Sequence, residues 1–178
     1  MGRPPHVVSH RSPHGLAFGV PEPARAGADR LATAAGALAR TGPPLLVVDC
    51  GTATTCTVVD RGAGGEPLYR GGAIAPGVGA ALEGLRRRAG HLPEPAAEPE
   101  VPGTTTEAAL ALGAVAGHAW MVEAVVERLA AACAAPPKLF LTGGWAPRLR
   151  PHLAAAHEFR PDLCLEGLLA IGGRLGLA

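Results

Sequence analysis

Apolar and polar positions along the 178-residue chain follow strand-like and helix-like patterns in alternation, which predicts a mixed α/β fold. Apolar or β-branched runs bounded by turn residues are typical of strands. They occur at residues 6–8, 16–20, 45–49, 54–60, 68–70 and 138–142. Helix-forming stretches occur at residues 27–40, 79–89, 104–134, 146–156 and 165–175. Between them, alternating Pro and Glu over 91–102 predict an exposed connector.

The strongest local signal is a predicted β-hairpin. Residues 45–49 form a continuous apolar run, residues 51–53 interrupt it, and residues 54–60 resume with β-branched side chains. A further turn over 62–67 leads into the short strand at 68–70. The sequence therefore predicts three consecutive antiparallel strands.

Composition and charge narrow the class of protein. Lys and Arg number 16 against 15 Asp and Glu, so the net charge of +1 provides no strong field for nucleic acid or an anionic membrane. Aromatic residues make up only 3%, which leaves few platforms for stacking bases. The uncharged helical stretch 108–122 is shorter than the roughly 18 residues that span a bilayer. Four cysteines without a C-x-x-C pair, and no signal-peptide pattern, favour a cytoplasmic protein that acts on a small molecule.

The hairpin turn carries residue types suited to a phosphate. Gly51 lets backbone N–H groups approach an anion, Thr52 adds a hydroxyl donor, and Asp49 at the strand end can hold a cation against the phosphates. An ordinary hairpin, whose threonines satisfy their own backbone, explains this segment equally well.

Three other segments contain candidate binding residues. Residues 27–30 place Asp29 and Arg30 at a helix start, where the carboxylate could accept a proton and the guanidinium could bind an anion. A first-turn Asp with a local ion partner is the alternative. Residues 142–144 expose glycine backbone at a strand end, and residues 103–106 open the long helix, where plain N-capping is the alternative.

Taken together, these segments closely resemble type III pantothenate kinases. The ordered motifs are Gly-Ala-Asp-Arg at 27–30, Val-Asp-Cys-Gly-Thr-Ala-Thr-Thr at 48–55, Gly-Gly-Ala-Ile-Ala-Pro-Gly at 71–77, Gly-Thr-Thr-Thr at 103–106 and Thr-Gly-Gly at 142–144. Residues 161–168 are similar to the closing Pro-Asp-Leu-x-Leu-x-Gly-Leu segment of the family. The resemblance covers nearly the whole chain.

The resemblance implies an actin-like ATPase (ribonuclease H-like) fold, a mixed sheet with flanking helices, that transfers the γ-phosphoryl group of ATP to pantothenate in the first step of coenzyme A biosynthesis. By likeness, the pantothenate site contains Gly27, Ala28, Asp29, Arg30 and Thr106, with Asp29 as proton acceptor. The ATP site contains Gly51, Thr52, Gly143 and Gly144. Asp49 holds a monovalent cation, K⁺ or NH₄⁺, and Mg²⁺ accompanies ATP.

The resemblance also implies a homodimer whose active site is completed across the subunit interface. The long helix offers Gly113-x-x-x-Gly117, a spacing that permits close helix approach. Core packing within one subunit would explain the same spacing.

The chain departs from the family pattern at its start, where the apolar strand and Asp-x-Gly-Asn-Thr turn of the family are missing. Residues 1–44 are therefore expected to be a remnant of the first lobe, and 45–178 the second lobe. Little kinase activity is expected from the chain as printed, because a preorganised magnesium and phosphate site contributes several kcal/mol to transition-state stabilisation. A non-catalytic relative that binds a ligand or partner is the alternative function.

The remaining histidines and cysteines suggest no separate chemistry. Pro13 argues against a helix that would align His6, His10 and His14 for zinc. His118 is interpreted as a packed or partly exposed side chain of the long helix, and the cysteines of the hairpin as buried thiols.

Overall fold

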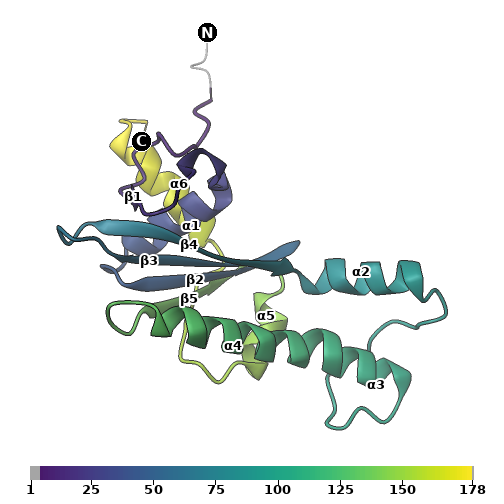
Figure 1. Ribbon diagram of the computed structural model, residues 1–178. Helices are drawn as coiled ribbons and strands as arrows, with labels where there is room; N and C mark the ends of the chain where they lie inside the picture. The colour runs from purple at the N-terminus through teal and green to yellow at the C-terminus, as the bar shows by residue number, and fades with distance from the viewer. Residues whose placement is uncertain (1–4, 178) are drawn as a thin grey trace.

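A single six-stranded mixed sheet organises the computed structural model, which describes residues 5–177 (Figure 1). The strand order is β1-β4-β3-β2-β5-β6. The strands are β1 (Ala17–Phe18), β2 (Leu45–Cys50), β3 (Ala53–Arg61), β4 (Pro67–Pro76), β5 (Lys138–Thr142) and β6 (Glu158–Phe159). The helices are η1 (Pro23–Arg25), α1 (Ala28–Leu38), α2 (Val78–Arg88), α3 (Thr106–Ala111), η2 (Leu112–Ala116), α4 (Gly117–Ala131), α5 (Ala146–Leu149), η3 (Arg150–His152) and α6 (Leu163–Arg174).

The predicted hairpin and the three antiparallel strands are confirmed. β2 pairs antiparallel with β3, and β3 pairs antiparallel with β4. On its other side β2 pairs parallel with β5, so the strands that begin at Leu45 and Lys138 end at the same edge of the sheet. That edge carries the hairpin turn and is where ligands of open α/β sheets bind.

Strand β4 is much longer than the predicted strand over 68–70. It continues to Pro76 because β3 offers a pairing partner along its whole length. The ladder absorbs Gly71 and Gly72, whose φ angles are +84° and +144°, at a register shift between Val58 and Val59. Turn-prone glycines therefore lie within a strand, which local sequence does not indicate.

Other differences from the predicted elements have equally local causes. Residues 6–8 form no strand, because residues 17–18 already pair with the outer edge of β4. The predicted helix over 146–156 ends early, in a 3₁₀ turn that contains Pro151, a residue without an amide donor. The two-residue strand β6, which pairs with β5, was not predicted.

Helices cover both faces of the sheet, α1 and α6 on one side and α4 and α5 on the other (Figure 1). Alternate residues of β2 point to the two sides, as the strand period requires. Leu46 and Val48 join the core under α4, whereas Leu45 and Val47 join the core under α1 and α6. Both cores therefore depend on this central strand.

Helices α1 and α6 pack at very close range, through two glycines that face each other. A Cβ atom added at Gly167 would collide with the carbonyl of Ala32, and one added at Gly36 would collide with the carbonyl of Leu163. The first helix of the chain is thereby fixed to the last.

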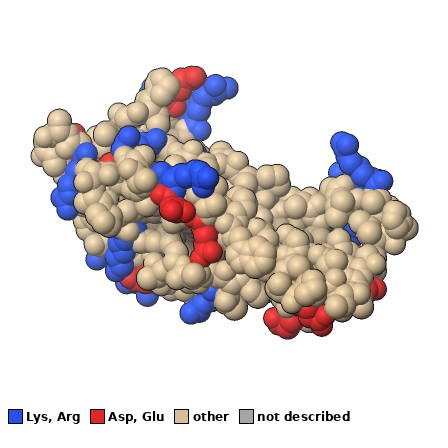
Figure 2. Space-filling view, turned by 60° about the horizontal axis from the view of Figure 1, so that its bottom comes forward, with Lys and Arg blue, Asp and Glu red and all other residues tan. Residues whose placement is uncertain are grey.

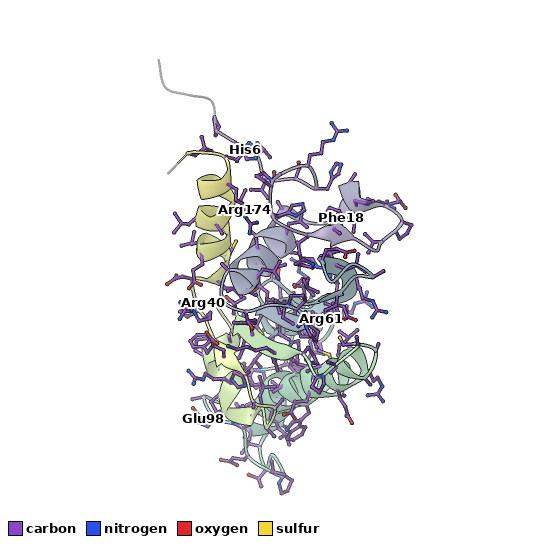
Figure 3. The ribbon with its side chains drawn as sticks, turned by 90° about the vertical axis from the view of Figure 1, so that its left-hand side faces the viewer. His6, Phe18, Arg40, Arg61, Glu98 and Arg174 are labelled. Atoms are coloured by element: carbon purple, nitrogen blue, oxygen red, sulfur yellow. The ribbon has the colours of Figure 1, made fainter. Side chains whose placement is uncertain are left out.

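Residues 13–18 pack near these helices, in the upper part of Figure 3, where Phe18 and Arg174 are labelled. Arg174 donates a hydrogen bond to the carbonyl of Pro13 (3.0 Å), and Phe18 packs edge-on against His14 and Tyr69. Residues 13–18 therefore belong to the same packed unit as α6.

Helices α3, η2 and α4 form one continuous 26-residue helix, Thr106–Ala131. By length and composition this helix could cross a membrane, which its uncharged stretch 108–122, taken alone, did not indicate. It instead packs on the sheet through Val115, Ala119, Val122 and Val126. A core helix of a globular domain meets the same criterion of length and composition.

Candidate active site

The hairpin turn opens onto a cavity of about 490 Å³ at the carboxyl edge of the sheet. The cavity is lined by Gly51, Thr52, Gly79, Ala80, Glu83, Gly144 and Trp145. Three of the residues predicted to contact ATP therefore line one space, although they come from two distant segments of the chain. Gly143, the fourth predicted residue, directly precedes Gly144 in the sequence.

Two backbone hydrogen bonds hold the turn in place. The Trp145 N–H donates to the carbonyl of Cys50 (2.9 Å), and the Gly77 N–H donates to the carbonyl of Thr52 (2.9 Å). Thr52 itself stays exposed. The turn is thus fixed from behind, while Thr52 remains accessible at the cavity.

Asp49 lies directly behind the turn, against Gly143. Gly143 has φ +95°, and a Cβ atom there would be 2.5 Å from Asp49 Oδ1. Only glycine allows the end of β5 to approach the carboxylate this closely. A Cβ at Gly51 would lie 3.6 Å from the same oxygen, so Asp49 is adjacent to both glycine-containing segments.

Asp49 is in an electrostatically unfavourable position for an anion. Burial raises the pKa of Asp49, and the negative charge of Asp29 raises it further. Asp29, the predicted base, and Asp49, the predicted cation ligand, therefore lie close enough for their charges to interact. A cation beside Asp49 would relieve both effects.

The described residues do not form a cluster of ligands for a divalent metal ion. Among residues 5–177, no group of three or more His, Cys, Asp or Glu side chains is arranged to hold a metal ion. Asp49 and Asp29 supply only two carboxylates.

The Gly-Ala-Asp-Arg segment lies at the start of α1, with Gly27 as the N-cap and Asp29 in the first turn. Arg30 is turned onto the sheet, where its Nε donates to Thr57 Oγ1 (3.0 Å) and its Nη2 to the carbonyl of Cys56 (3.3 Å). Asp29, Ala28 and Arg30 do not line the cavity at the hairpin. Arg30 thus braces α1 against β3 in this structure, a role that the sequence did not indicate.

Thr106 lies apart from the other predicted residues. It is the exposed first residue of α3, on the opposite side of the sheet from α1 (Figure 1). The preceding Thr105 caps the helix by accepting the Ala108 N–H (3.1 Å), which confirms N-capping at this position. Within one chain, Thr106 and Asp29 are not brought together.

Both hairpin cysteines are buried thiols, as predicted. Burial raises the pKa of Cys50 to about 12 and that of Cys56 to about 11. Neither forms a thiolate near neutral pH, so neither is a candidate nucleophile.

Four cavity residues were missed by sequence reasoning: Gly79, Ala80, Glu83 and Trp145. Trp145 directly follows the Thr-Gly-Gly segment, and its indole Nε1 lies near Gly79 on the first turn of α2. Glu83 reaches the cavity one turn further along α2. The sequence did offer a signal for Trp145, because one of the two tryptophans of the chain directly follows a glycine motif.

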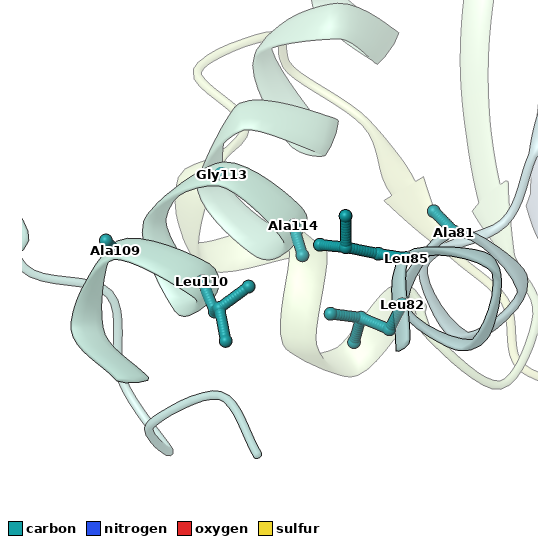
Figure 4. Close-up of a pocket in the computed structure, with 7 residues that line it drawn as sticks. All are labelled: Ala81, Leu82, Leu85, Ala109, Leu110, Gly113 and Ala114. Carbon is teal, nitrogen blue, oxygen red and sulfur yellow. The ribbon is translucent and has the colours of Figure 1, made fainter. Parts of the chain in front are cut away.

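A second, apolar groove of about 440 Å³ runs between α2 and α3 (Figure 4). It is lined by Ala81, Leu82, Leu85, Ala109, Leu110, Gly113 and Ala114. A Cβ at Gly113 would meet no described atom within 4 Å, so packing within this chain does not require glycine there. The groove lacks the polar groups that a phosphate needs.

The chain also matches known proteins in sequence and in fold. A family model described as type III pantothenate kinase matches residues 1–128. The type III pantothenate kinase of Anaeromyxobacter dehalogenans is 41% identical over 160 residues, 86% of this chain and 61% of that protein. The type III pantothenate kinase of Phenylobacterium zucineum is 36% identical over 172 residues, 96% of this chain and 65% of that protein.

The chain thus spans 61% and 65% of the length of these two relatives. A solved structure from Campylobacter jejuni, whose description names the Baf family of transcriptional activators, covers 94% of this chain with a TM-score of 0.58 at 20% identity. At that identity it supports the fold alone. The family-model match and the two relatives establish that the chain belongs to the type III pantothenate kinase family.

Proposed function

We propose that this chain contributes to the ATP-dependent phosphorylation of pantothenate to 4'-phosphopantothenate, the first step of coenzyme A biosynthesis. One observation carries the proposal: Gly51, Thr52 and Gly144 line a single cavity, with Asp49 directly behind it. Phosphoryl transfer depends on positioning and charge neutralisation more than on covalent chemistry, and a backbone cradle with a cation ligand supplies both.

Each residue has a distinct role in this proposal. The Gly51 backbone and the Thr52 hydroxyl bind the phosphates of ATP, and Gly143 and Gly144 admit the rest of the nucleotide to the end of β5. Asp49 holds K⁺ or NH₄⁺, whose charge neutralises phosphate oxygens. Asp29 accepts the proton of the pantothenate hydroxyl, and the segment 27–30 lines the pantothenate site. Mg²⁺ accompanies ATP and is held by its phosphates.

The architecture fits an actin-like ATPase fold in which residues 45–178 form the second lobe and residues 1–44 the end of the first. In this arrangement the close packing of α1 on α6 joins the Gly-Ala-Asp-Arg segment directly to the second lobe. We also propose a cytoplasmic location.

A homodimer would bring Thr106 of one copy to the segment 27–30 of the other. Two observations support it. Thr106 lies across the sheet from α1 in one chain. The helices nearest to it also present an apolar groove, and in Figure 2 the charged groups of the arm that contains α2 and α3 lie at its edges, not across its middle.

Product formation tests the proposal directly. The purified chain, alone and preceded by any in-frame residues that its gene encodes upstream, is incubated with Mg-ATP, KCl and pantothenate, and phosphopantothenate is detected by mass. Asp29→Asn should lower kcat roughly 10²- to 10⁴-fold, the range for loss of a general base, without changing the melting temperature greatly. Undiminished turnover would remove Asp29 from its role.

Nucleotide binding is tested separately through Trp145. In a Trp120→Phe background, Trp145 is the sole tryptophan, and MgADP should quench its fluorescence because the ring lines the cavity. Trp145→Leu should weaken MgADP binding roughly tenfold in calorimetry, by loss of aromatic contact. No fluorescence response and no heat of binding would argue against a nucleotide in this cavity. Binding without product would favour the non-catalytic alternative.

A further inference from the structure

A buried hydrogen bond connects the long helix to the strand that leaves the hairpin turn. His118 Nε2 and Thr54 Oγ1 are 2.8 Å apart, and the two residues are 9% and 3% exposed. His118 lies in the first turn of α4, and Thr54 is two residues beyond Thr52. Neither residue has a part in the phosphate chemistry described above.

Thr54 is well placed to control the turn. It pairs with Cys50 across the hairpin and with Ala75 on its other side, so it is held between two strands just where the turn closes. Because strand side chains alternate, Thr54 faces α4 on the same side as Cys56 and Val58, which belong to the core under that helix. Only Ala53 separates Thr54 from Thr52, so a hydrogen bond that fixes the Thr54 side chain also restricts the turn.

The helix has an irregular geometry just before His118. Residues 112–116 form a π-helical turn, which inserts an extra residue and changes the direction of the side chains that follow. Single π-helical turns within α-helices are frequent at functional sites. Here the next turn carries the buried imidazole.

The pair requires both partners. A neutral imidazole has one donor and one acceptor nitrogen, and the threonine hydroxyl can match either. Burial lowers the pKa of His118, which is consistent with the neutral form. Removing either side chain would leave a buried polar group on the other element without its partner.

We propose that His118 is a positioning residue for the phosphate-binding hairpin, because its hydrogen bond to Thr54 fixes β3 where it leaves the Gly51–Thr52 turn. The nucleotide part of this inference rests on the proposed function. The mechanical part, that the bond holds the turn closed, does not.

Hydrogen exchange of the purified chain tests the mechanical part without any substrate. The reporters are the amides of Gly51, which donates to the Ala53 carbonyl, and of Gly77, which donates to the Thr52 carbonyl. His118→Leu and Thr54→Val should each speed exchange at these two amides roughly threefold to tenfold, as expected for loss of one buried hydrogen bond. The double variant should exchange no faster than either single variant, because both remove the same bond.

Three further variants separate positioning from general destabilisation. His118→Gln and Thr54→Ser retain hydrogen-bonding groups and should restore slow exchange. Val126→Ala, in the core on the same helix, should lower the melting temperature without selectively affecting the two amides. Equal acceleration in Val126→Ala, additive effects in the double variant, or no effect in His118→Leu would overturn the proposal.

Calorimetry with MgADP then tests the nucleotide part. His118→Leu should weaken MgADP binding, by at most the factor by which it speeds exchange, because affinity falls only with the fraction of chains whose turn is closed, and His118→Gln should recover it. If MgADP binds none of the proteins while exchange behaves as expected, the proposed function fails and the mechanical role stands. Unchanged MgADP affinity in a His118→Leu variant with faster exchange would overturn the link to the nucleotide.

Discussion

Asp49 is the residue whose surroundings conflict most with its charge. Its carboxylate is partly buried, it lies against Gly143, and it feels the charge of Asp29. Because its pKa is raised in the folded chain, the ionised form is less favourable there than in the unfolded chain. The cost of ionisation is therefore absent at low pH, develops as the pH rises from the unfolded pKa through the folded one, and is complete once the pH is above both.

Asp49→Asn should consequently raise the melting temperature at pH 7, and the difference from the wild type should disappear below about pH 4, where an aspartate of the unfolded chain takes up its proton. Added KCl should raise the melting temperature of the wild type but not of Asp49→Asn, because the ion neutralises the carboxylate. Calorimetric melts with and without KCl measure both effects. Glu127→Gln, on an exposed surface, is the control and should change neither. A lower melting temperature for Asp49→Asn would contradict this account.

At the scale of elements, the far end of the β3–β4 pair is fixed by a buried carboxylate. Asp60 accepts a hydrogen bond from Arg70 (2.8 Å), one from its neighbour Arg61 N–H (2.8 Å) and one from the Ala134 N–H (3.2 Å). Burial alone would raise the pKa of Asp60, but these hydrogen bonds and the charge of Arg70 outweigh it, so the pKa lies below its usual range. Asp60 thus connects the end of α4 to the sheet.

Asp60→Ala should destabilise the chain by about 1–3 kcal/mol at pH 7, the range for leaving buried donors unpaired. Since the folded pKa is lowered, the stabilisation is complete above the unfolded pKa and is lost as the pH falls through the folded one. Urea unfolding at pH 7 and at successively lower pH should therefore show the wild type converging on Asp60→Ala in acid. A constant difference at every pH would assign the effect to packing instead.

For the whole molecule, the apolar groove between α2 and α3 and the position of Thr106 predict a dimer with shared active sites. Leu85 is 43% exposed beside this groove. Leu85→Glu should reduce the mass measured by light scattering to that of one chain, because a buried charge opposes association. Leu168→Glu, at a similarly exposed leucine on α6, serves as the control and should leave the mass unchanged. A wild-type mass of one chain would contradict the dimer.

Active sites shared between two subunits predict complementation between inactive variants. The experiment uses the chain with or without its upstream residues, whichever is active. Asp29→Asn and Thr106→Ala should each be poorly active alone, but mixed and allowed to exchange subunits they should regain activity, since one site of each hybrid contains both native residues. Phosphopantothenate formation before and after mixing provides the measurement. No gain on mixing would contradict active sites shared between subunits.

The sequence by itself determined what depends on neighbouring residues. The apolar run 45–49, the glycine turn and the β-branched run 54–60 were enough to predict the hairpin, and the ordered motifs were enough to indicate the family. Local periodicity reports which faces an element buries, so α1, α2, α6 and the long helix were predicted to within a few residues of their observed bounds.

Only the tertiary structure decided what depends on contacts between distant segments. It extended β4 along β3, turned Arg30 onto Thr57, and separated Thr106 from Asp29. It also brought Trp145 to the hairpin cavity and paired His118 with Thr54 across 64 positions of sequence. The physical reason is that a polar or aromatic side chain has the same local pattern whether it meets solvent, a ligand or a partner, and the packing of remote elements selects among them.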